Sequence, residues 1–411
     1  MQRIPIRSTL ALLIHMRPFI FLLLLLLNIP ASLLGQEKDS IHFRSVTFEQ
    51  ALEMARAEKK PVFLHGYASW CHYCSEMAEQ VYTDKEVADF FNARFVCIKM
   101  DMEKEGREMN KKLKIKNFPT HVFFDYKNAQ MMHRAAGKKS KEEFLQTGRD
   151  AIDSTKQLRS YEQLYYSKKA TAKEAATYMK MLDKAGLDNQ PVINSYLLEL
   201  STDALLKQDN WRIMYDLFRE VELPAFQKVM ENREAYAEKY SADSIDNKII
   251  TLYNAALMMR VQKLDSLGYR NMTDKLRTSG LDLSEKIIAY ADLNSFKMKS
   301  DWKSYQTAAV PFVDKYCAND YRRLNDVAYN FYERVSDKEL LAKAETWAQR
   351  AVTLQDNIKN NHTLAGLYFK LGKKDQAKIT CEHTIELARK AGVDYKQSTL
   401  LLEKIDAMKT E

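Results

Sequence analysis

Two cysteines separated by two residues, Cys71 and Cys74, follow a short apolar segment and precede a segment with helical periodicity. The apolar segment, residues 61–64, is typical of the end of a buried strand. This order places Cys71 at a helix N-terminus, where unpaired backbone N–H groups and the helix dipole stabilise a thiolate. The sequence therefore predicts a redox-active Cys-x-x-Cys pair at a strand-to-helix junction.

The two sulfurs are expected to have different roles. A helix N-terminus typically lowers a cysteine pKa from about 8.5 to between about 3.5 and 7.5, so Cys71 is the predicted attacking sulfur. Cys74 lies one helical turn further on and faces the same side, so it can attack a mixed disulfide on Cys71 and release the partner. We expect no cofactor beyond this redox-active disulfide.

A Cys-x-x-Cys pair can also be half of a zinc site, which needs two further ligands. His121, His133 and Cys97 are the candidates, but the sequence holds no second pair of this kind, and we expect no metal. Cys97 alternates with apolar neighbours and is expected to be a small buried residue. Cys317 and Cys381 are expected to fill helical cores, with a free thiol or an intermolecular bridge as the alternative.

The first 35 residues have the features of a secretory signal peptide. They contain three arginines, no acidic residue, and an apolar run over residues 19–27 that ends before Pro30. We expect cleavage after Gly35 and an exported, periplasmic protein. An uncleaved membrane anchor is the alternative, although about 20 apolar residues are usually needed to span a bilayer.

Length and charge limit the remaining possibilities. A chain of 411 residues is longer than one hydrophobic core usually holds, which indicates two or three domains. The formal net charge is +8, but the lysines are interleaved with acids rather than clustered. This pattern argues against a nucleic-acid partner.

Residues 36–157 alternate between helical and strand patterns. Capping boxes that begin at Thr47, Thr83 and Ser140 predict three helix starts. Strands are expected over residues 62–65, 94–101, 121–125 and 130–135, the last pairing antiparallel with the one before it. The predicted order is helix, strand, helix, strand, helix, strand, strand, helix.

This order, with the cysteine pair at a strand-to-helix junction, resembles the thioredoxin fold, an α/β fold with a central mixed sheet flanked by helices. Phe118, Pro119 and Thr120 match the loop that thioredoxins place opposite their active site, with the proline in the cis form. The resemblance implies that these three residues help to bind the substrate. The string from residue 70 to 87 looks most like secreted thioredoxin-like domains related to the C-terminal domains of thiol-disulfide interchange proteins.

One departure from the thioredoxin pattern concerns the proton acceptor. Thioredoxins have a buried aspartate six residues before the first cysteine, and His65 stands at that position here. A histidine can accept the Cys74 proton near neutral pH, so His65 is a candidate catalytic residue. The alternative is a half-buried strand residue that is hydrogen-bonded to the backbone.

The second departure lies between the cysteines, where His72 and Tyr73 replace Gly-Pro. A protonated His72 would stabilise the Cys71 thiolate and make the pair more oxidising. The alternative is an exposed ring with little effect. Trp70 is expected to form a wall of the substrate groove, with Tyr73 beside it.

The chain beyond about residue 160 has a different pattern, with sparse Gly and Pro and apolar residues at three- and four-residue spacing. Near the end, residues 364–384 match most of the tetratricopeptide pattern, with Thr384 in place of its last alanine, and residues 328–351 repeat it. We therefore expect an all-α region, repeat-like over residues 158–320 and tetratricopeptide-like over 321–411. Stacked helix pairs leave a concave face that can bind a peptide or protein. The alternative is a helical domain that only buries its own core.

These observations favour an exported thiol-disulfide oxidoreductase that reduces, isomerises or oxidises disulfides in partner proteins and is itself recharged by an upstream redox protein. The sequence does not determine the direction. The alternative is a non-catalytic scaffold whose helical repeats hold a partner while the thioredoxin-like domain is vestigial. A membrane is expected as a partner only if the N-terminal segment stays uncleaved.

Overall fold

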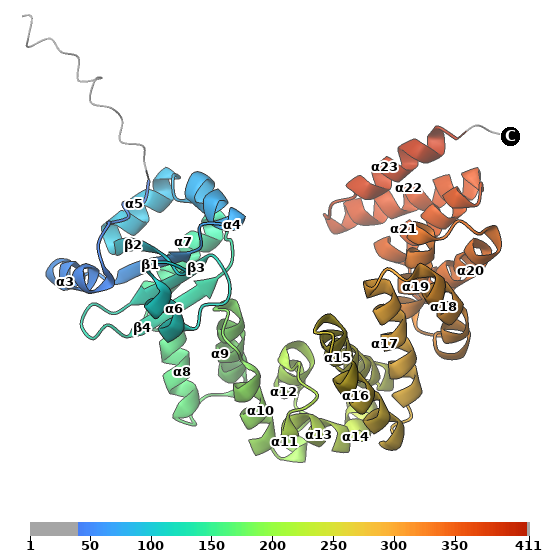
Figure 1. Cartoon of the computed structure of the whole chain (residues 1–411), viewed down its shortest axis with the longest axis horizontal. Helices are drawn as coiled ribbons and strands as arrows, with labels where there is room; N and C mark the ends of the chain where they lie inside the picture. The colour runs from blue at the N-terminus through green and yellow to red at the C-terminus, as the bar shows by residue number, and fades with distance from the viewer. Residues whose placement is uncertain (1–39, 409–411) are drawn as a thin grey trace, which may run out of the picture. The chain divides into compact units, whose positions relative to one another are not determined.

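The computed structural model describes residues 40–408, which fall into two compact units divided between Ile193 and Asn194. The first unit is α/β and the second is helical (Figure 1). The predicted signal peptide and its cleavage site after Gly35 lie outside the described residues. Within residues 40–408, no helix combines the length and the apolar character that crossing a membrane requires.

The first unit follows the predicted order of elements and adds two helices. Its elements are α3 (Phe48–Glu58), β1 (Val62–Tyr67), α4 (His72–Glu76), the π-helix η2 (Met77–Val81), α5 (Lys85–Arg94), β2 (Val96–Asp101), α6 (Arg107–Leu113), β3 (Thr120–Phe124), β4 (Met131–Ala136), α7 (Lys141–Ile152), α8 (Leu158–Tyr166) and α9 (Ala172–Lys184).

The four strands form one mixed sheet in the order β2-β1-β3-β4. Strand β1 pairs parallel with β2 and antiparallel with β3, and β4 pairs antiparallel with β3 as predicted. This sheet, with helices packed on it, confirms the predicted α/β thioredoxin-like fold. Because side chains alternate along a strand, Phe63 and Phe123 pack on one face, while Leu64 and Val122 pack on the other.

Two of the three predicted capping boxes form, at Thr47 and Ser140. The third prediction was wrong by one residue, because Asp84 caps α5 and accepts hydrogen bonds from the backbone N–H groups of Glu86 and Val87. The Thr83 hydroxyl instead donates to the Glu79 carbonyl at 2.6 Å. A carboxylate at a helix N-terminus is a stronger acceptor than a hydroxyl and also complements the dipole.

Helices α8 and α9 pack against the edge strand β4, so the first unit continues past residue 157, where the sequence places a domain boundary. The remaining elements are α10 (Gln190–Glu199), α11 (Thr202–Leu205), α12 (Gln208–Arg212), the π-helix η3 (Ile213–Leu217), α13 (Pro224–Glu231), α14 (Arg233–Tyr240), α15 (Ala242–Gln262), α16 (Ser266–Thr278), α17 (Ser284–Met298), α18 (Trp302–Tyr316), α19 (Tyr321–Arg334), α20 (Lys338–Leu354), α21 (Ile358–Lys370), α22 (Lys374–Ala391) and α23 (Lys396–Asp406). The predicted all-helical C-terminal region is confirmed.

Consecutive helices in the last part of the second unit pack against each other, α19 on α20 and α21 on α22. Small residues lie at these contacts, and Ala344, Ala365 and Ala377 are fully buried. A Cβ atom added to Gly366 would lie 2.6 Å from ring atoms of Tyr332, so the close approach requires glycine there. That these helix pairs are tetratricopeptide-like repeats stays a prediction.

Candidate redox site

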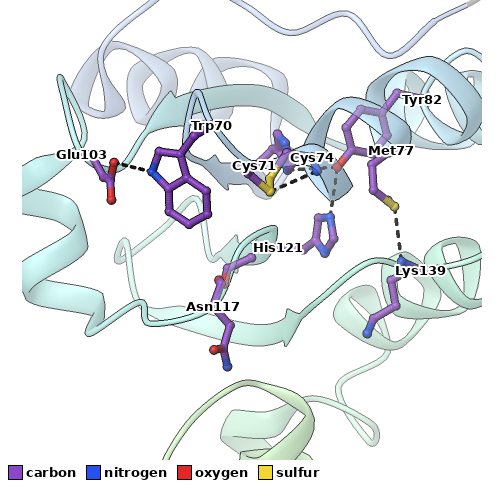
Figure 2. Close-up of a disulfide and its surroundings, with 11 residues drawn as sticks. Trp70, Cys71, Cys74, Met77, Tyr82, Glu103, Asn117, His121 and Lys139 are labelled. Carbon is purple, nitrogen blue, oxygen red and sulfur yellow. Dashed lines mark hydrogen bonds between the residues drawn. A yellow bond between two sulfur atoms is a disulfide. The ribbon is translucent and has the colours of Figure 1, made fainter.

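The cysteine pair lies where the sequence places it, at the start of a helix after the first strand. Cys71 is the N-cap of α4, and its Sγ accepts a hydrogen bond from the backbone N–H of Cys74 at 3.1 Å. The two residues are joined by a disulfide, with their Cα atoms 5.3 Å apart (Figure 2). An N–H group already aimed at Sγ would stabilise a Cys71 thiolate after reduction.

The disulfide lies among apolar side chains, beside one large exposed ring. Both cysteines are 5% exposed and pack with Ala68. Trp70 is 69% exposed, and its ring meets the Phe118 ring edge-to-face with centroids 5.9 Å apart. The Trp70 indole N–H donates to Glu103 Oε2 at 2.8 Å (Figure 2), so a hydrogen bond and the Phe118 contact together hold the exposed ring.

The other three candidate residues are Phe118 and Pro119 in the loop before β3 and Thr120 at the first position of β3. The Phe118–Pro119 peptide bond is cis. The carbonyl of Pro119 accepts the backbone N–H of Gly137 at 2.7 Å, and the buried Thr120 hydroxyl donates to the Asn117 carbonyl at 2.6 Å. Thr120 therefore braces the loop from inside. The contribution of these residues to substrate binding stays a prediction.

The two residues between the cysteines face solvent. The His72 side chain is 81% exposed, with Nε2 3.5 Å from Glu76 Oε1. Glu76 also bonds Lys138 Nζ at 2.7 Å, and this hydrogen bond holds the pKa of Glu76 below its ordinary value. Tyr73 lies beside Lys138, whose Nζ is 6.0 Å from the centroid of the Tyr73 ring. The sequence places Tyr73 beside Trp70, but the ring that packs on Trp70 in the structure is that of Phe118.

His65 is buried in β1, and among residues 40–408 its ring bonds a side chain rather than the backbone. Its Nδ1 is 2.9 Å from the hydroxyl of Tyr82, and the same hydroxyl is 3.0 Å from Nε2 of His121. Burial, reinforced by Lys99, lowers the pKa of His65 to about 3. Burial likewise lowers the pKa of His121 well below its ordinary value and raises that of Tyr82. All three groups are therefore neutral near pH 7.

A family model named Thioredox_DsbH, described as "Protein of unknown function, DUF255", matches residues 28–113, a range that includes the cysteine pair and strands β1 and β2. The thiol:disulfide interchange protein DsbD of Ralstonia nicotianae is 32% identical over 107 residues, which are 25% of this chain and 17% of that protein. Thioredoxin-1 of Drosophila melanogaster is 34% identical over 67 residues, 16% of this chain and 59% of that protein.

The N-terminal domain is thioredoxin-like. A solution structure from Bacteroides thetaiotaomicron, which its title assigns provisionally as a disulphide-isomerase, is 35% identical and covers 29% of this chain and 98% of that chain, with a TM-score of 0.27. The chain spans less than a fifth of the length of the first curated relatives that it matches.

The sequence analysis missed two functional candidates in the thioredoxin-like domain, Tyr82 as a site residue and His121 as anything but a metal ligand. The alternation of side chains along a strand was an available signal for His121. It puts residues 121 and 123 on one face of their strand, just as it puts residues 63 and 65 on one face of theirs. No comparable signal marks Tyr82, which reaches the site from the end of a π-helix. Within residues 40–408, no three His, Cys, Asp or Glu side chains are grouped so that they could hold a metal ion.

The other three cysteines are buried, as predicted. Burial raises the pKa of Cys317 to about 12 and that of Cys381 to about 11, and it raises the pKa of Cys97 as well. These thiols stay protonated near neutral pH, and a protonated thiol is a poor nucleophile. The reactive sulfur chemistry of the described residues is therefore concentrated in the thioredoxin-like domain.

Proposed function

We propose that this chain is an exported thiol-disulfide oxidoreductase that exchanges its Cys71–Cys74 disulfide with cysteines of partner proteins. The observation that carries the proposal is the position of Cys71, which caps a helix with its Sγ already accepting a backbone N–H. The adjoining exposed Trp70 ring and the cis-Pro119 loop supply a surface for an extended partner chain. The DsbD relative is named a thiol:disulfide interchange protein.

The exchange takes two balanced steps when a partner is reduced. The Cys71 thiolate attacks one sulfur of the partner's disulfide, forming a mixed disulfide and expelling the other partner sulfur as a thiolate. Cys74 then loses its proton and attacks the Cys71 sulfur, which forms the Cys71–Cys74 disulfide and releases the second partner thiolate. The partner gains two electrons and the cysteine pair loses two. Oxidation of a partner is the same sequence reversed.

Export is part of the proposal and rests on the amino-acid pattern of residues 1–35. An oxidising compartment would suit an enzyme that keeps its remaining cysteines buried and protonated. Protein thiols or disulfides are the proposed substrates, and an upstream redox protein would recharge the pair.

The test is the reduction potential of the pair in the purified chain, equilibrated against glutathione buffers, with Cys71→Ser as the control. A value near about −270 mV indicates a reductant that needs an electron donor, and one near about −120 mV an oxidant of exported thiols. If no pair titrates in the wild-type chain, the oxidoreductase proposal fails and the scaffold interpretation replaces it.

A groove in the second unit favours a second, binding function. It has a volume of about 890 Å³ and is lined by α19, α21 and the start of α23. Its lining includes three tyrosines and three cationic side chains, namely Tyr321, Tyr329, Tyr395, Arg322, Lys359 and Lys396. The groove has two acids: Asp326 lies 3.5 Å from Lys297, and Asp394 accepts the backbone N–H of Lys396 and keeps its charge. With three cations against two acids, the lining has an excess of one positive charge.

This charge balance favours an acidic segment of an extended polypeptide as the occupant. Carboxylates would pair with the cations while the tyrosine rings contact the chain. The test is fluorescence anisotropy with a glutamate-rich peptide and a matched glutamine-rich peptide. We expect tighter binding of the first, weakened by salt and by Arg322→Glu with Lys359→Glu, and unaffected by Lys343→Glu on α20. Equal affinity for the two peptides would exclude this second function.

A further inference from the structure

Two buried histidines face each other on neighbouring strands of the sheet in the thioredoxin-like domain. His65 on β1 and His121 on β3 are direct partners in the antiparallel register, and their rings lie with centroids 5.5 Å apart. The Tyr82 hydroxyl bridges them, 2.9 Å from Nδ1 of His65 and 3.0 Å from Nε2 of His121. Figure 2 shows Tyr82 and His121 in the surroundings of the disulfide, with a hydrogen bond between them.

The π-helix η2 explains how Tyr82 reaches this position. Met77 to Val81 form η2 directly after α4, and the backbone N–H of Tyr82 bonds the Met77 carbonyl at 2.9 Å. A five-residue hydrogen-bonded turn widens the helix and rotates the residue that follows it. The Tyr82 side chain consequently points into the core, where it is 3% exposed.

The single hydroxyl proton of Tyr82 couples the tautomers of the two histidines. The hydroxyl donates to one ring nitrogen and accepts an N–H from the other, so one of the two facing nitrogens carries hydrogen and the other is bare. If Tyr82 donates to His65, then Nε2 of His65 carries the proton and the ring has no nitrogen free to accept another. If Tyr82 donates to His121, then Nδ1 of His65 carries the proton and Nε2 is bare.

The second arrangement is the one that suits a proton acceptor. We propose that Tyr82 and His121 are positioning residues that hold His65 with Nε2 bare, so that it takes the Cys74 proton when Cys74 attacks the mixed disulfide. This inference deepens the proposed function and rests on it. His121 then carries its hydrogen on Nδ1, an atom that is buried without a hydrogen-bond partner among the described residues.

The geometry relates His65 to the cysteines through one aromatic neighbour. The His65 and Tyr67 rings are stacked, with centroids 5.8 Å apart and planes 10° from parallel. Tyr67 in turn packs against the buried cluster formed by Cys71 and Cys74. Both side chains lie on the same face of β1, because they are two residues apart.

The proton passes from Cys74 into the buried groups and then out of them. The Cys74 thiol gives its proton to Nε2 of His65 in the same step in which its electron pair forms the bond to Cys71 and the partner thiolate leaves. The transfer is transient, because burial and Lys99 lower the pKa of His65 to about 3. Nδ1 of His65 can pass its hydrogen to Tyr82, and Tyr82 its own to Nε2 of His121, which moves the positive charge one ring further from the site. Lys99 near His65 and Lys139 near His121 oppose a lasting charge, so the proton is passed on to the departing thiolate or to solvent.

A first experiment reads the tautomer directly and needs no turnover. Nitrogen-15 NMR of labelled histidine in the full-length chain should show His65 with hydrogen on Nδ1 in the wild type and a mixture of tautomers in Tyr82→Phe. The phenylalanine keeps the ring and removes only the hydroxyl. Hydrogen on Nε2 of His65 in the wild type would overturn the inference, whatever the activity of the chain.

A second experiment measures the resolving step. Reduced chain is mixed with oxidised glutathione, and the attack of Cys74 on the Cys71–glutathione disulfide is timed across pH. Tyr82→Phe and His121→Leu should slow this step by about tenfold near pH 7, and by less as the pH approaches the ordinary thiol pKa of about 8.5. His121→Gln should restore most of the rate, because its amide oxygen can accept the Tyr82 hydroxyl.

Thermal unfolding identifies any variant that has merely lost its fold. A Tyr82→Phe chain that is folded and has the wild-type rate and pH profile would overturn the inference and leave the oxidoreductase proposal intact. Absence of any exchange with glutathione in the wild-type chain would instead refute the oxidoreductase proposal, and the relay with it.

Discussion

The indole N–H of Trp70 donates a 2.8 Å hydrogen bond to the carboxylate of Glu103, which lies 33 residues further along the chain. Trp70 is the most exposed large ring beside the disulfide, yet this bond and the Phe118 ring fix its orientation. A ring that is already ordered loses little conformational entropy when a partner chain binds against it. The proposed partner-binding surface is therefore preorganised on one side of the cysteine pair.

Glu103→Ala should release the Trp70 ring without removing it. We expect KM for a disulfide-bonded protein substrate to rise about threefold to tenfold, with kcat unchanged, because binding is weakened and the sulfur chemistry is not. The free energy of unfolding should fall by less than about 1 kcal/mol, since the bond is exposed. Glu108→Ala, which removes a surface carboxylate paired with Lys111, is the matched control. An unchanged KM in Glu103→Ala would contradict the prediction.

Different trapping behaviour is expected from the two cysteines. Reduced Cys74→Ser should accumulate a mixed disulfide between Cys71 and an oxidised partner, because no sulfur is left to release it. Cys71→Ser should accumulate none. Adding Cys317→Ala to the Cys74→Ser chain should change nothing, since burial raises the pKa of that thiol to about 12. Non-reducing gel electrophoresis measures the adduct, and equal trapping by both single variants would be inconsistent with the assigned roles.

Stability should be lost in mild acid because of the buried histidines. An unfolded histidine titrates near pH 6.5, whereas burial lowers the pKa of His65 to about 3 and that of His133 to about 4. Below about pH 6.5 the unfolded chain binds protons that the native chain does not. The free energy of unfolding therefore falls with pH, by up to about 1.4 kcal/mol per pH unit for each such histidine.

Urea unfolding between about pH 7.5 and about pH 4.5 measures this slope. His65→Gln should reduce it by the contribution of about one proton. The same slope in the variant and the wild type would show that His65 does not take part in the linkage.

Gly186, just after α9, lies against the loop that precedes Pro119. It has a positive φ of 66°, and a Cβ atom there would lie 3.1 Å from both Asn117 Nδ2 and Ala136 Cβ. Gly186→Ala should therefore have two effects. It should strain the backbone by about 1 kcal/mol, and it should displace the loop before Pro119. We expect a higher KM as well as lower stability.

Gly280→Ala is the matched control, because Gly280 has a positive φ of 71° with open space around its Cβ position. It should lower stability by a similar backbone strain and leave KM unchanged. Equal effects of the two variants on KM would contradict a specific contact with the loop.

The elements of the first unit were largely predictable because their signals are local. The Ser140 capping box, the apolar run before Cys71 and the turn before β4 each act over a few residues. Thr83 was misassigned as a cap because two adjacent residues competed for the same role, and the carboxylate of Asp84 prevailed. The position of Cys71 at a helix start followed from the same local signals.

The partners of the site residues were not predictable in this way. The sequence by itself determined the order of helices and strands, the cysteine spacing and the alternation that puts His65 on one face of its strand. Only the tertiary structure decided that His121 lies opposite it, that Tyr82 bridges the two, and that Glu103 holds Trp70. The reason is physical, because strand register and contacts between distant segments are set by packing of the whole core rather than by local propensity.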